Sequence, residues 1–144
     1  MPYLFDTNHC IYLMNGWNNP QSVLTPQERN TVDSFKKKEN DIIYMCEASV
    51  GELIYGVERS QRKKSNLEKL KALLLAVPPI PVTRSAWEIY GQTKAILSKN
   101  GIIIPDIDLL IASTAKYYDM VLVANDKHMR YLPDSFAREN WAKG

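Results

Sequence analysis

The 144-residue chain has little cysteine and histidine, and it has no long apolar run. Its two cysteines (Cys10 and Cys46) form no CxxC motif, and its only histidines are His9 and His128. A zinc site of cysteine and histidine ligands therefore has no support. Both cysteines lie in apolar segments, so we expect buried free thiols. No stretch approaches the roughly 18 apolar residues of a membrane-spanning helix. The N-terminal segment also lacks the basic and apolar parts of a signal peptide, which predicts a cytoplasmic protein without a membrane partner.

Glycine is also scarce, with six residues, and the common glycine-rich functional motifs do not occur. The patterns GxGxxG, GxxxxGK followed by Ser or Thr, and GxSxG are all missing. Dinucleotide-cofactor folds, P-loop nucleotide-binding folds and serine hydrolases therefore gain no support. The net charge is only +2, but basic residues gather at Lys36–Lys38 and Arg59–Lys64. Such runs are typical of solvated helix faces; the alternative is a basic surface that holds a polyanion near an acidic pocket.

Short apolar runs alternate with stretches of helical periodicity along the chain. This alternation favours a parallel sheet covered by helices. We therefore predict an α/β fold, a three-layer α/β/α sandwich with a central mostly parallel sheet of about four or five short strands. A chain of this length suits one domain, spanning residues 1–144. The predicted strands are 3–5, 41–46, 80–82 and 120–124, the predicted helices are 8–15, 26–38, 49 onward, 65–77, 84–99 and 106–118, and the tail 133–144 carries no clear pattern.

Local sequence patterns mark where several of these helices begin and end. Thr25–Glu28 and Ser49–Glu52 each have the residue types of a capping box, in which the first and last side chains exchange hydrogen bonds with each other's backbone. Thr83 is a predicted N-cap, and Asn100-Gly101 ends the helix that Thr83 starts. Gly16–Pro20 is rich in turn residues and predicts a break after the first helix.

Four acidic residues follow predicted strands or begin predicted helices: Asp6, Glu52, Asp108 and Asp126. Asp6 and Asp126 come after apolar runs, whereas Glu52 and Asp108 lie in the first turns of predicted helices. Because ligands of open α/β sheets bind beyond the carboxyl ends of the strands, we expect these acids to meet at that edge. Carboxylates gathered so closely repel one another unless a cation holds them. Oxygen ligands favour Mg²⁺ or Mn²⁺, which indicates metal-dependent phosphodiester chemistry.

Helix capping is the simpler explanation for any one of these acids. In that interpretation Asp6 caps the first helix, and Glu52 is the capping-box partner of Ser49. Asp108 is stabilised by the positive end of a helix dipole. Asp126 caps the turn that follows it. Four acids at one sheet edge exceed what capping requires, so the metal-site hypothesis depends on the whole set.

Polar neighbours of the acids add to this hypothesis. Thr7 offers a hydroxyl group and Asn8 an amide, and both can hold a water on the metal or a carboxylate that binds it. Asp106 either caps the helix that begins there or supports the site. His9 and His128 have no partner nearby in the sequence, so we interpret both as non-catalytic.

Together, these motifs resemble the PIN-domain family, and more narrowly the VapC toxins of bacterial type II toxin–antitoxin modules. The resemblance covers about residues 3–141, and it is closest to the branch that cleaves initiator tRNA. It combines the acidic spacing with the residues around each acid. The segments that carry it are Phe5–Tyr12, Glu52–Ser60, Tyr90-Gly91, Asp108–Ala112, Val121–Asp126 and Glu139–Trp141.

The resemblance implies a PIN-like fold and an Mg²⁺- or Mn²⁺-dependent endoribonuclease. It also implies an RNA substrate, with tRNA as a candidate, a homodimer, and a small antitoxin protein whose C-terminal segment blocks the pocket. Hydrolysis by an activated water leaves a 5′-phosphate and a 3′-hydroxyl, and it requires no protein nucleophile. The family's acidic positions correspond to Asp6, Glu52, Asp108 and Asp126, with Thr7, Asn8 and Asn125 beside them.

Two departures from the family pattern affect these expectations. Ala124 stands where the family often has Thr, which removes a hydroxyl group from the pocket, and the stretch 16–24 is longer than usual, which bears on RNA preference. The main alternative is a catalytically inactive PIN-like module that binds RNA or protein. Retention of all four acids favours the nuclease. A metal-dependent phosphatase of another family needs a second aspartate two residues after Asp6, and the chain has Asn8 there.

Overall fold

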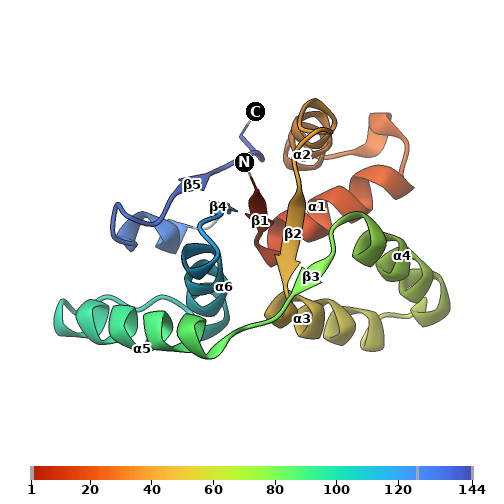
Figure 1. Ribbon diagram of the computed structural model, residues 1–144. Coiled ribbons are helices and arrows are strands. Elements are labelled where there is room, and N and C mark those ends of the chain that lie inside the picture. Colours follow the sequence, from red (N-terminus) through yellow and green to blue (C-terminus); the bar gives the residue numbers. More distant parts are fainter. Residues whose placement is uncertain (1, 126, 144) are drawn as a thin grey trace.

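The computed structural model of the chain describes residues 2–125 and 127–143. Five strands form one sheet in the order β3-β2-β1-β4-β5, and all four neighbouring pairs are parallel (Figure 1). The predicted mostly parallel sheet is therefore confirmed, with β3 at one edge. The strands are β1 (Tyr3–Phe5), β2 (Ile43–Cys46), β3 (Pro79–Ile80), β4 (Val121–Val123) and β5 (Arg138–Glu139).

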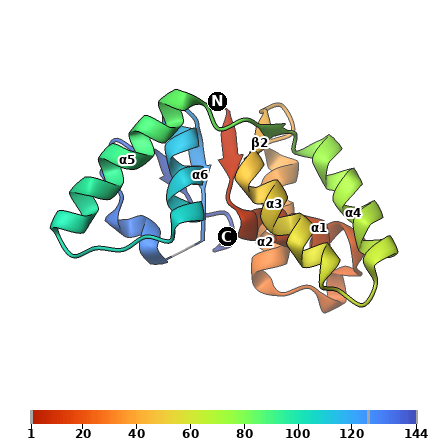
Figure 2. The same cartoon turned by 90° about the horizontal axis from the view of Figure 1, so that it is seen from below.

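Helices cover both faces of this sheet, which confirms the predicted three-layer sandwich (Figures 1 and 2). Four helices pack on one face and two on the other, each burying apolar residues against the strands. The first face carries α1 (Thr7–Asn18), α2 (Pro26–Lys37), α3 (Glu47–Glu58) and α4 (Lys63–Ala76); the second carries α5 (Arg84–Lys99) and α6 (Asp106–Tyr117). Two short 3₁₀ helices complete the structure, η1 (Gln21–Val23) and η2 (Lys127–Tyr131).

The central strand β1 is apolar throughout because both of its faces are covered. Tyr3 and Phe5 pack toward α1–α4, and Leu4 packs toward α5 and α6. All three side chains are buried, as expected for a strand in the middle of a parallel sheet. The first polar residue after this strand is Asp6, which therefore emerges at the carboxyl edge of the sheet.

Helix caps that the sequence predicts are present at three places. Thr25 and Glu28 form the complete capping box of α2, with nitrogen–oxygen distances of 3.2 and 2.9 Å. The Thr83 hydroxyl accepts a hydrogen bond from the Ala86 backbone N–H at 3.1 Å, at the start of α5. Gly101 follows α5 with φ of +69°, the left-handed conformation that glycine adopts at low cost.

The predicted break at Gly16–Pro20 begins too early. α1 continues through Gly16 and ends at Asn18, because Gly16 allows a close helix contact and does not form a turn. A Cβ atom built on Gly16 comes within 2.2 Å of Cγ2 of Val32 on α2. Glycine therefore lets α1 and α2 approach more closely than any larger residue permits.

Three further predictions about local structure are wrong. Ser49 does not cap a helix, because α3 begins directly after β2 at Glu47 and Ser49 lies buried in its first turn. Asp106 is the first residue of α6, and Pro105 occupies the N-cap position. The tail contains β5, which adds to the sheet beside β4. A strand of two residues leaves too short a pattern to detect in the sequence.

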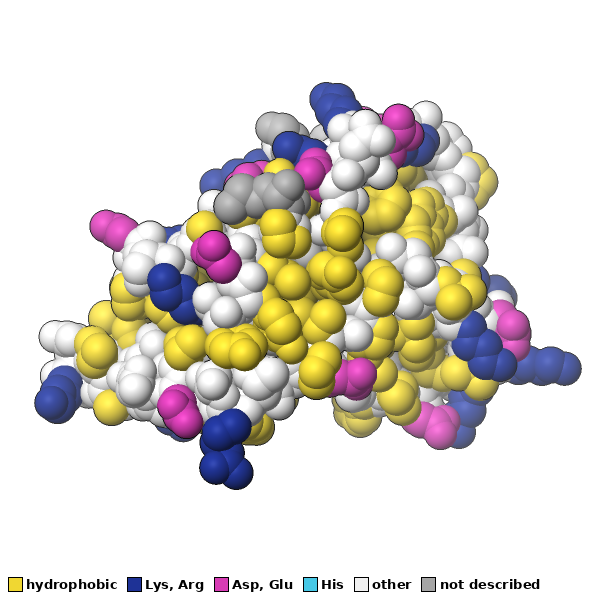
Figure 3. Space-filling model, viewed as in Figure 1, with side chains coloured by type: hydrophobic (Ala, Val, Ile, Leu, Met, Phe, Trp, Pro, Cys, Tyr) yellow, Lys and Arg dark blue, Asp and Glu magenta, His cyan; other side chains and the backbone are white. Residues whose placement is uncertain are grey.

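Large hydrophobic side chains remain exposed on the surface, including Tyr55, Leu75, Trp87 and Ile103. Figure 3 shows hydrophobic side chains gathered across the middle of one face, with charged side chains mainly toward its rim. Within residues 2–125 and 127–143, no helix is long and apolar enough to cross a bilayer. An exposed apolar surface of this kind is typical of a protein that binds partners.

Candidate active site

Asp6 lies at the junction of β1 and α1, where the fold holds it firmly. Its backbone N–H donates to the Val123 carbonyl on β4 at 2.9 Å. Its Oδ1 accepts from the His9 backbone N–H at 2.8 Å, which makes Asp6 the N-cap of α1. Its Oδ2 accepts from the Asn125 backbone N–H at 3.2 Å. The residue is only 4% exposed, so few orientations of this carboxylate are open to it.

His9 contacts Asp6 a second time through its side chain. The Nδ1 atom lies 2.8 Å from Asp6 Oδ1, and the imidazole ring is completely buried. An ionised carboxylate can only accept, so Nδ1 carries the proton in this contact. The buried Nε2 atom has no hydrogen-bond partner among the described residues. The interpretation that His9 lacks a nearby partner is therefore wrong, since Asp6 is three residues away.

Glu52 and Asp108 approach the same region from two different helices. Asp108 is the third residue of α6, as the sequence predicts, whereas Glu52 lies beyond the first turn of α3 and not within it. The Thr7 hydroxyl donates to the Glu52 carboxylate, and it lies 3.0 Å from the Ser49 hydroxyl. The buried Ser49 therefore helps to hold Thr7, a role that the sequence did not reveal.

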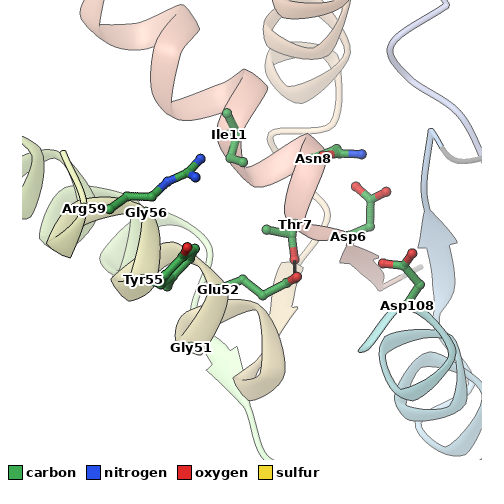
Figure 4. A pocket seen from close by; sticks show the side chains of 10 residues that line it. All are labelled: Asp6, Thr7, Asn8, Ile11, Gly51, Glu52, Tyr55, Gly56, Arg59 and Asp108. Carbon is green, nitrogen blue, oxygen red and sulfur yellow. Dashed lines mark hydrogen bonds between the residues drawn. The ribbon is translucent and has the colours of Figure 1, made fainter. Parts of the chain in front are cut away.

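These side chains line one cavity of about 590 Å³, which we call the acid cavity (Figure 4). In Figure 4, Asp6 and Asp108 lie on one side of it, and Glu52 extends from the opposite wall toward Thr7. Three of the four predicted acids are thus brought together, and the fourth, Asp126, lies outside the described residues. The lining consists of Asp6, Thr7, Asn8, Ile11, Gly51, Glu52, Tyr55, Gly56, Arg59 and Asp108.

The remaining predicted site residues have different positions. Asn8 lines the acid cavity, whereas Asn125 supports it from outside through its backbone bond to Asp6. Asp106 is not part of the lining, because its carboxylate accepts hydrogen bonds from Lys94 and from the Tyr90 hydroxyl, both at 2.8 Å. The Lys94 and Tyr90 contacts lower the pKa of Asp106 below its usual value.

Asn125 belongs to a small network that sequence inspection missed. Its side-chain amide donates to the Tyr12 hydroxyl at 3.2 Å, and its side-chain oxygen accepts from Asn140 at 2.9 Å. Asn140 in turn accepts from the Ala142 backbone N–H at 2.9 Å. The tail of the chain therefore fixes the residue that contacts Asp6. The only trace of this in the sequence is Glu139-Asn140-Trp141 among the segments of the family resemblance.

The two cysteines contribute no nucleophile to the site. Both are free and buried, as predicted. Burial raises the pKa of the Cys10 thiol well above its usual value, and the negative charge of Asp6 raises it further. Burial also raises the pKa of Cys46. Since the thiolate is the reactive form, both cysteines are inert structural residues.

Comparison with known proteins agrees with the fold. Residues 3–134 match the PIN domain. The chain belongs to the PIN-domain family. It is 33% identical over 144 residues to ribonuclease VapC2 of Rickettsia felis, covering 99% of this chain and 100% of that protein. It is 28% identical to the tRNA(fMet)-specific endonuclease VapC of Shigella flexneri, covering 99% of both chains.

A solved structure shares the arrangement of this PIN domain. It is the crystal structure of VapBC2 from Rickettsia felis, bound to a DNA fragment from their promoter. The matching chain has 30% sequence identity and a TM-score of 0.83, and the match covers 98% of this chain and 99% of that one. The predicted PIN-like sandwich is therefore confirmed.

Proposed function

We propose that this chain is a metal-dependent endoribonuclease of the VapC type and the toxin of a toxin–antitoxin pair. The observation that carries the proposal is the convergence of Asp6, Glu52 and Asp108 on one cavity at the carboxyl edge of a PIN-domain sheet. Relatives that align over nearly the whole chain are named ribonuclease and endonuclease. A binding module without activity has no need of three carboxylates around an open cavity.

The chemistry of the cavity fits a hard divalent cation. Within the described residues, no group of three or more His, Cys, Asp and Glu side chains lies close enough to hold a metal ion. Mg²⁺ does not need such a cage, because it commonly binds through one or two carboxylates and completes its shell with water and substrate phosphates. We propose Asp6 and Asp108 as its ligands, and Mn²⁺ suits the same oxygen atoms. Glu52, and Asp126 from the sequence prediction, complete the proposed set.

Hydrogen bonds from neighbouring residues hold the carboxylates of the acid cavity in place for binding a cation. When bound, the cation supplies a Lewis acid that activates water and offsets charge on the scissile phosphate. His9 and Asn125 donate to the two oxygens of Asp6 and so hold its orientation before any ligand arrives. Thr7 holds Glu52 in the same way. We propose water as the attacking group, with a 5′-phosphate and a 3′-hydroxyl as the ends that it leaves, since the Thr7 hydroxyl in the lining is held by Glu52.

We propose tRNA as the first substrate to test. The support is the 28% identical relative that is named a tRNA(fMet)-specific endonuclease. Ala124, where the family often has Thr, lies beside Asn125 at the end of β4 and does not line the acid cavity itself. Direct measurement on candidate RNAs tests the RNA preference of this chain.

We also propose where the antitoxin binds. An apolar cavity of about 230 Å³ lies between α1, α3 and α4, and Ile11, Glu52 and Gly56 line both it and the acid cavity. A peptide segment that fills this groove therefore reaches the acid cavity directly. The similar solved structure is a VapBC complex, which supports an antitoxin partner, and the groove is where we propose that this partner binds. The exposed Trp87 on α5 marks the surface that we propose for a homodimer.

Sequencing of RNA 5′ ends after brief induction tests the proposed activity. Wild-type protein is compared with Asp6→Asn, which retains an equally good N-cap for α1. We expect new 5′-phosphate ends only with the wild type. Purified protein should cleave the same RNA with Mg²⁺ and stop in EDTA. Cleavage that continues in EDTA rules out the metal, and RNA binding without cleavage at any metal concentration supports the inactive module.

A further inference from the structure

A second cavity, of about 490 Å³, lies beyond the carboxyl ends of β4 and β5, and we call it the basic cavity. Ala124 and Asn125 follow β4 into its wall, and Asn140 follows β5. It thus shares a sheet edge with the acid cavity. Among the described residues, the charged ones that line it are Lys127, Arg130, Arg138, Lys143 and Glu139, so four cations face one carboxylate there.

The wall between the two cavities is a continuous chain of hydrogen bonds. Asp6 in the acid cavity accepts from the Asn125 backbone at 3.2 Å, and Asn125 accepts from Asn140 at 2.9 Å. Asn125 and Asn140 both line the basic cavity. A ligand that lies in the basic cavity therefore contacts the same residues that hold Asp6.

The cations of this cavity have two different roles. Arg138 donates through Nη1 to the carbonyl groups of Pro133 and Phe136 at 3.2 and 3.1 Å, so it stabilises the tail. Lys127, Arg130 and Lys143 are exposed, and no ion pair joins any of them to a carboxylate within residues 2–125 and 127–143.

Some cations elsewhere in the molecule do have a carboxylate partner. Lys63, Lys71 and Lys94 each lie within 3.9 Å of a carboxylate oxygen. Among the described residues of the basic cavity, the one acid is itself engaged, since Glu139 accepts from the Trp141 indole N–H at 3.0 Å. Within this described part, the positive charge of the basic cavity is therefore left largely uncompensated, as expected for an anion-binding surface.

We propose that the basic cavity binds backbone phosphates of the RNA strand next to the bond that is cut in the acid cavity. This inference rests on the proposed ribonuclease function and adds where the substrate lies. A polyanion that passes from one cavity to the other meets the cation-binding acids first and the lysine and arginine side chains next. The backbone phosphates of RNA carry negative charge at regular intervals, so one strand can place a phosphate in each of the two adjacent cavities. Contacts to phosphates give affinity without base specificity.

The test measures binding of a fluorescently labelled initiator-tRNA transcript by anisotropy at several salt concentrations. All proteins carry Asp108→Asn to prevent cleavage, since this change leaves the contact between Asp6 and Asn125 in place. The triple variant is Lys127→Ala, Arg130→Ala and Lys143→Ala. The matched control removes the same charge through Lys36→Ala, Lys37→Ala and Lys99→Ala, all exposed. α2 ends at Lys37, beside the start of β2, so Lys36 and Lys37 lie toward the opposite edge of the sheet.

We expect the triple variant to raise the Kd at least about 10-fold and to flatten the slope of log affinity against log salt by about 2, because each lost phosphate contact removes roughly 0.7 to 0.9 from it. The control should change the Kd less than about 3-fold. An equal effect of the two variants overturns the proposal. Circular dichroism confirms folding, and the double variant Lys127→Ala, Lys143→Ala replaces the triple if that protein fails to fold.

The same variants in the cleavage-competent protein separate this proposal from the proposed function. We expect KM to rise while kcat stays within about 3-fold. If the wild type cleaves RNA and the triple variant keeps its Kd and KM, the basic cavity is not the RNA site, although the nuclease assignment stands. If no RNA is cut but tRNA binding still depends on these three residues, the nuclease assignment fails and the binding site stands. Loss of antitoxin affinity alone assigns the cavity to a protein partner and overturns the proposal.

Discussion

The acid cavity and the basic cavity lie at one edge of the sheet, but they are built in different ways. The acid cavity places carboxylates on short side chains, and Asp6 is fixed by backbone and imidazole N–H groups and is almost completely buried. The basic cavity places its ammonium and guanidinium groups on long exposed side chains of η2 and the tail. A metal ion needs ligands at fixed positions, whereas a flexible polyanion needs only charge within reach.

Because of this difference, we expect substitutions in the two cavities to change different kinetic constants. Loss of a carboxylate removes transition-state stabilisation and lowers kcat. Loss of a cation weakens binding of substrate and transition state alike, which raises KM. A residue that faces neither cavity should change neither constant. Variants of Asp108, His9 and Asp106 distinguish effects on kcat from effects on KM.

Asp108→Asn should have the largest effect, with kcat lowered about 10³-fold, or about 4 kcal/mol of barrier, because a proposed metal ligand is lost. The Kd for tRNA should stay within about 3-fold, since the basic cavity is unchanged. The thermal midpoint should fall only slightly, because a charge near the N-terminus of α6 is worth about 0.3–1 kcal/mol. Single-turnover kinetics and anisotropy measure the two constants. Parallel losses of cleavage and binding contradict the division.

His9→Leu should lower kcat about 10- to 100-fold, the range seen when a hydrogen-bonding partner of a metal ligand is removed. The imidazole donates to Asp6 at 2.8 Å, and leucine leaves the carboxylate free to turn. The Mg²⁺ concentration for half-maximal activity should rise as well, which a mere packing defect does not cause. His9→Asn is the matched variant, because its amide can donate the same hydrogen bond, and we expect it to recover most of the loss. Equal loss in both variants assigns His9 to packing alone.

Asp106→Asn should have the smallest effect, with kcat and KM both within about 2-fold, since Asp106 does not line the acid cavity and touches neither substrate nor metal there. The residue lies two positions before Asp108 but binds Lys94 and Tyr90 outside the acid cavity. Its lowered folded-state pKa means that its small stabilisation is present above the unfolded pKa and is lost as pH falls through the folded value. Thermal midpoints of wild type and variant should therefore converge in acid. A large loss of cleavage refutes its place outside the site.

The position of the site could be predicted from the sequence because it depends on where apolar strands end and helices begin. Apolar strands end at Asp6 and just before Asn125, and parallel pairing then places these ends at one edge. Asp108 was placed correctly because α6 begins two residues before it. Local pattern and tertiary structure agree at these points.

The prediction failed where the local sequence pattern and the tertiary packing favour different structures. Ser49–Glu52 has the residue types of a helix start, yet burial of Ser49 against Thr7 decides its place within α3. The sequence does not predict the contact between His9 and Asp6, because this contact depends on the orientation of the imidazole ring inside the core. The sequence did not predict the basic cavity either. Its cations are spread over 127–143 without forming a run, whereas Lys36–Lys38 form a visible run at the end of α2.

The close contact at Gly16 has a consequence for the whole of α1. The helix has 12 residues and is therefore a stiff rod about 18 Å long, with Asp6 at one end and Gly16 near the other. A single methyl group added at Gly16 meets Cγ2 of Val32 on α2, so either this side chain turns or the two helices move apart. Because Asp6 caps the other end of this rod, the spacing of α1 and α2 at Gly16 bears on the alignment of a carboxylate well away from it.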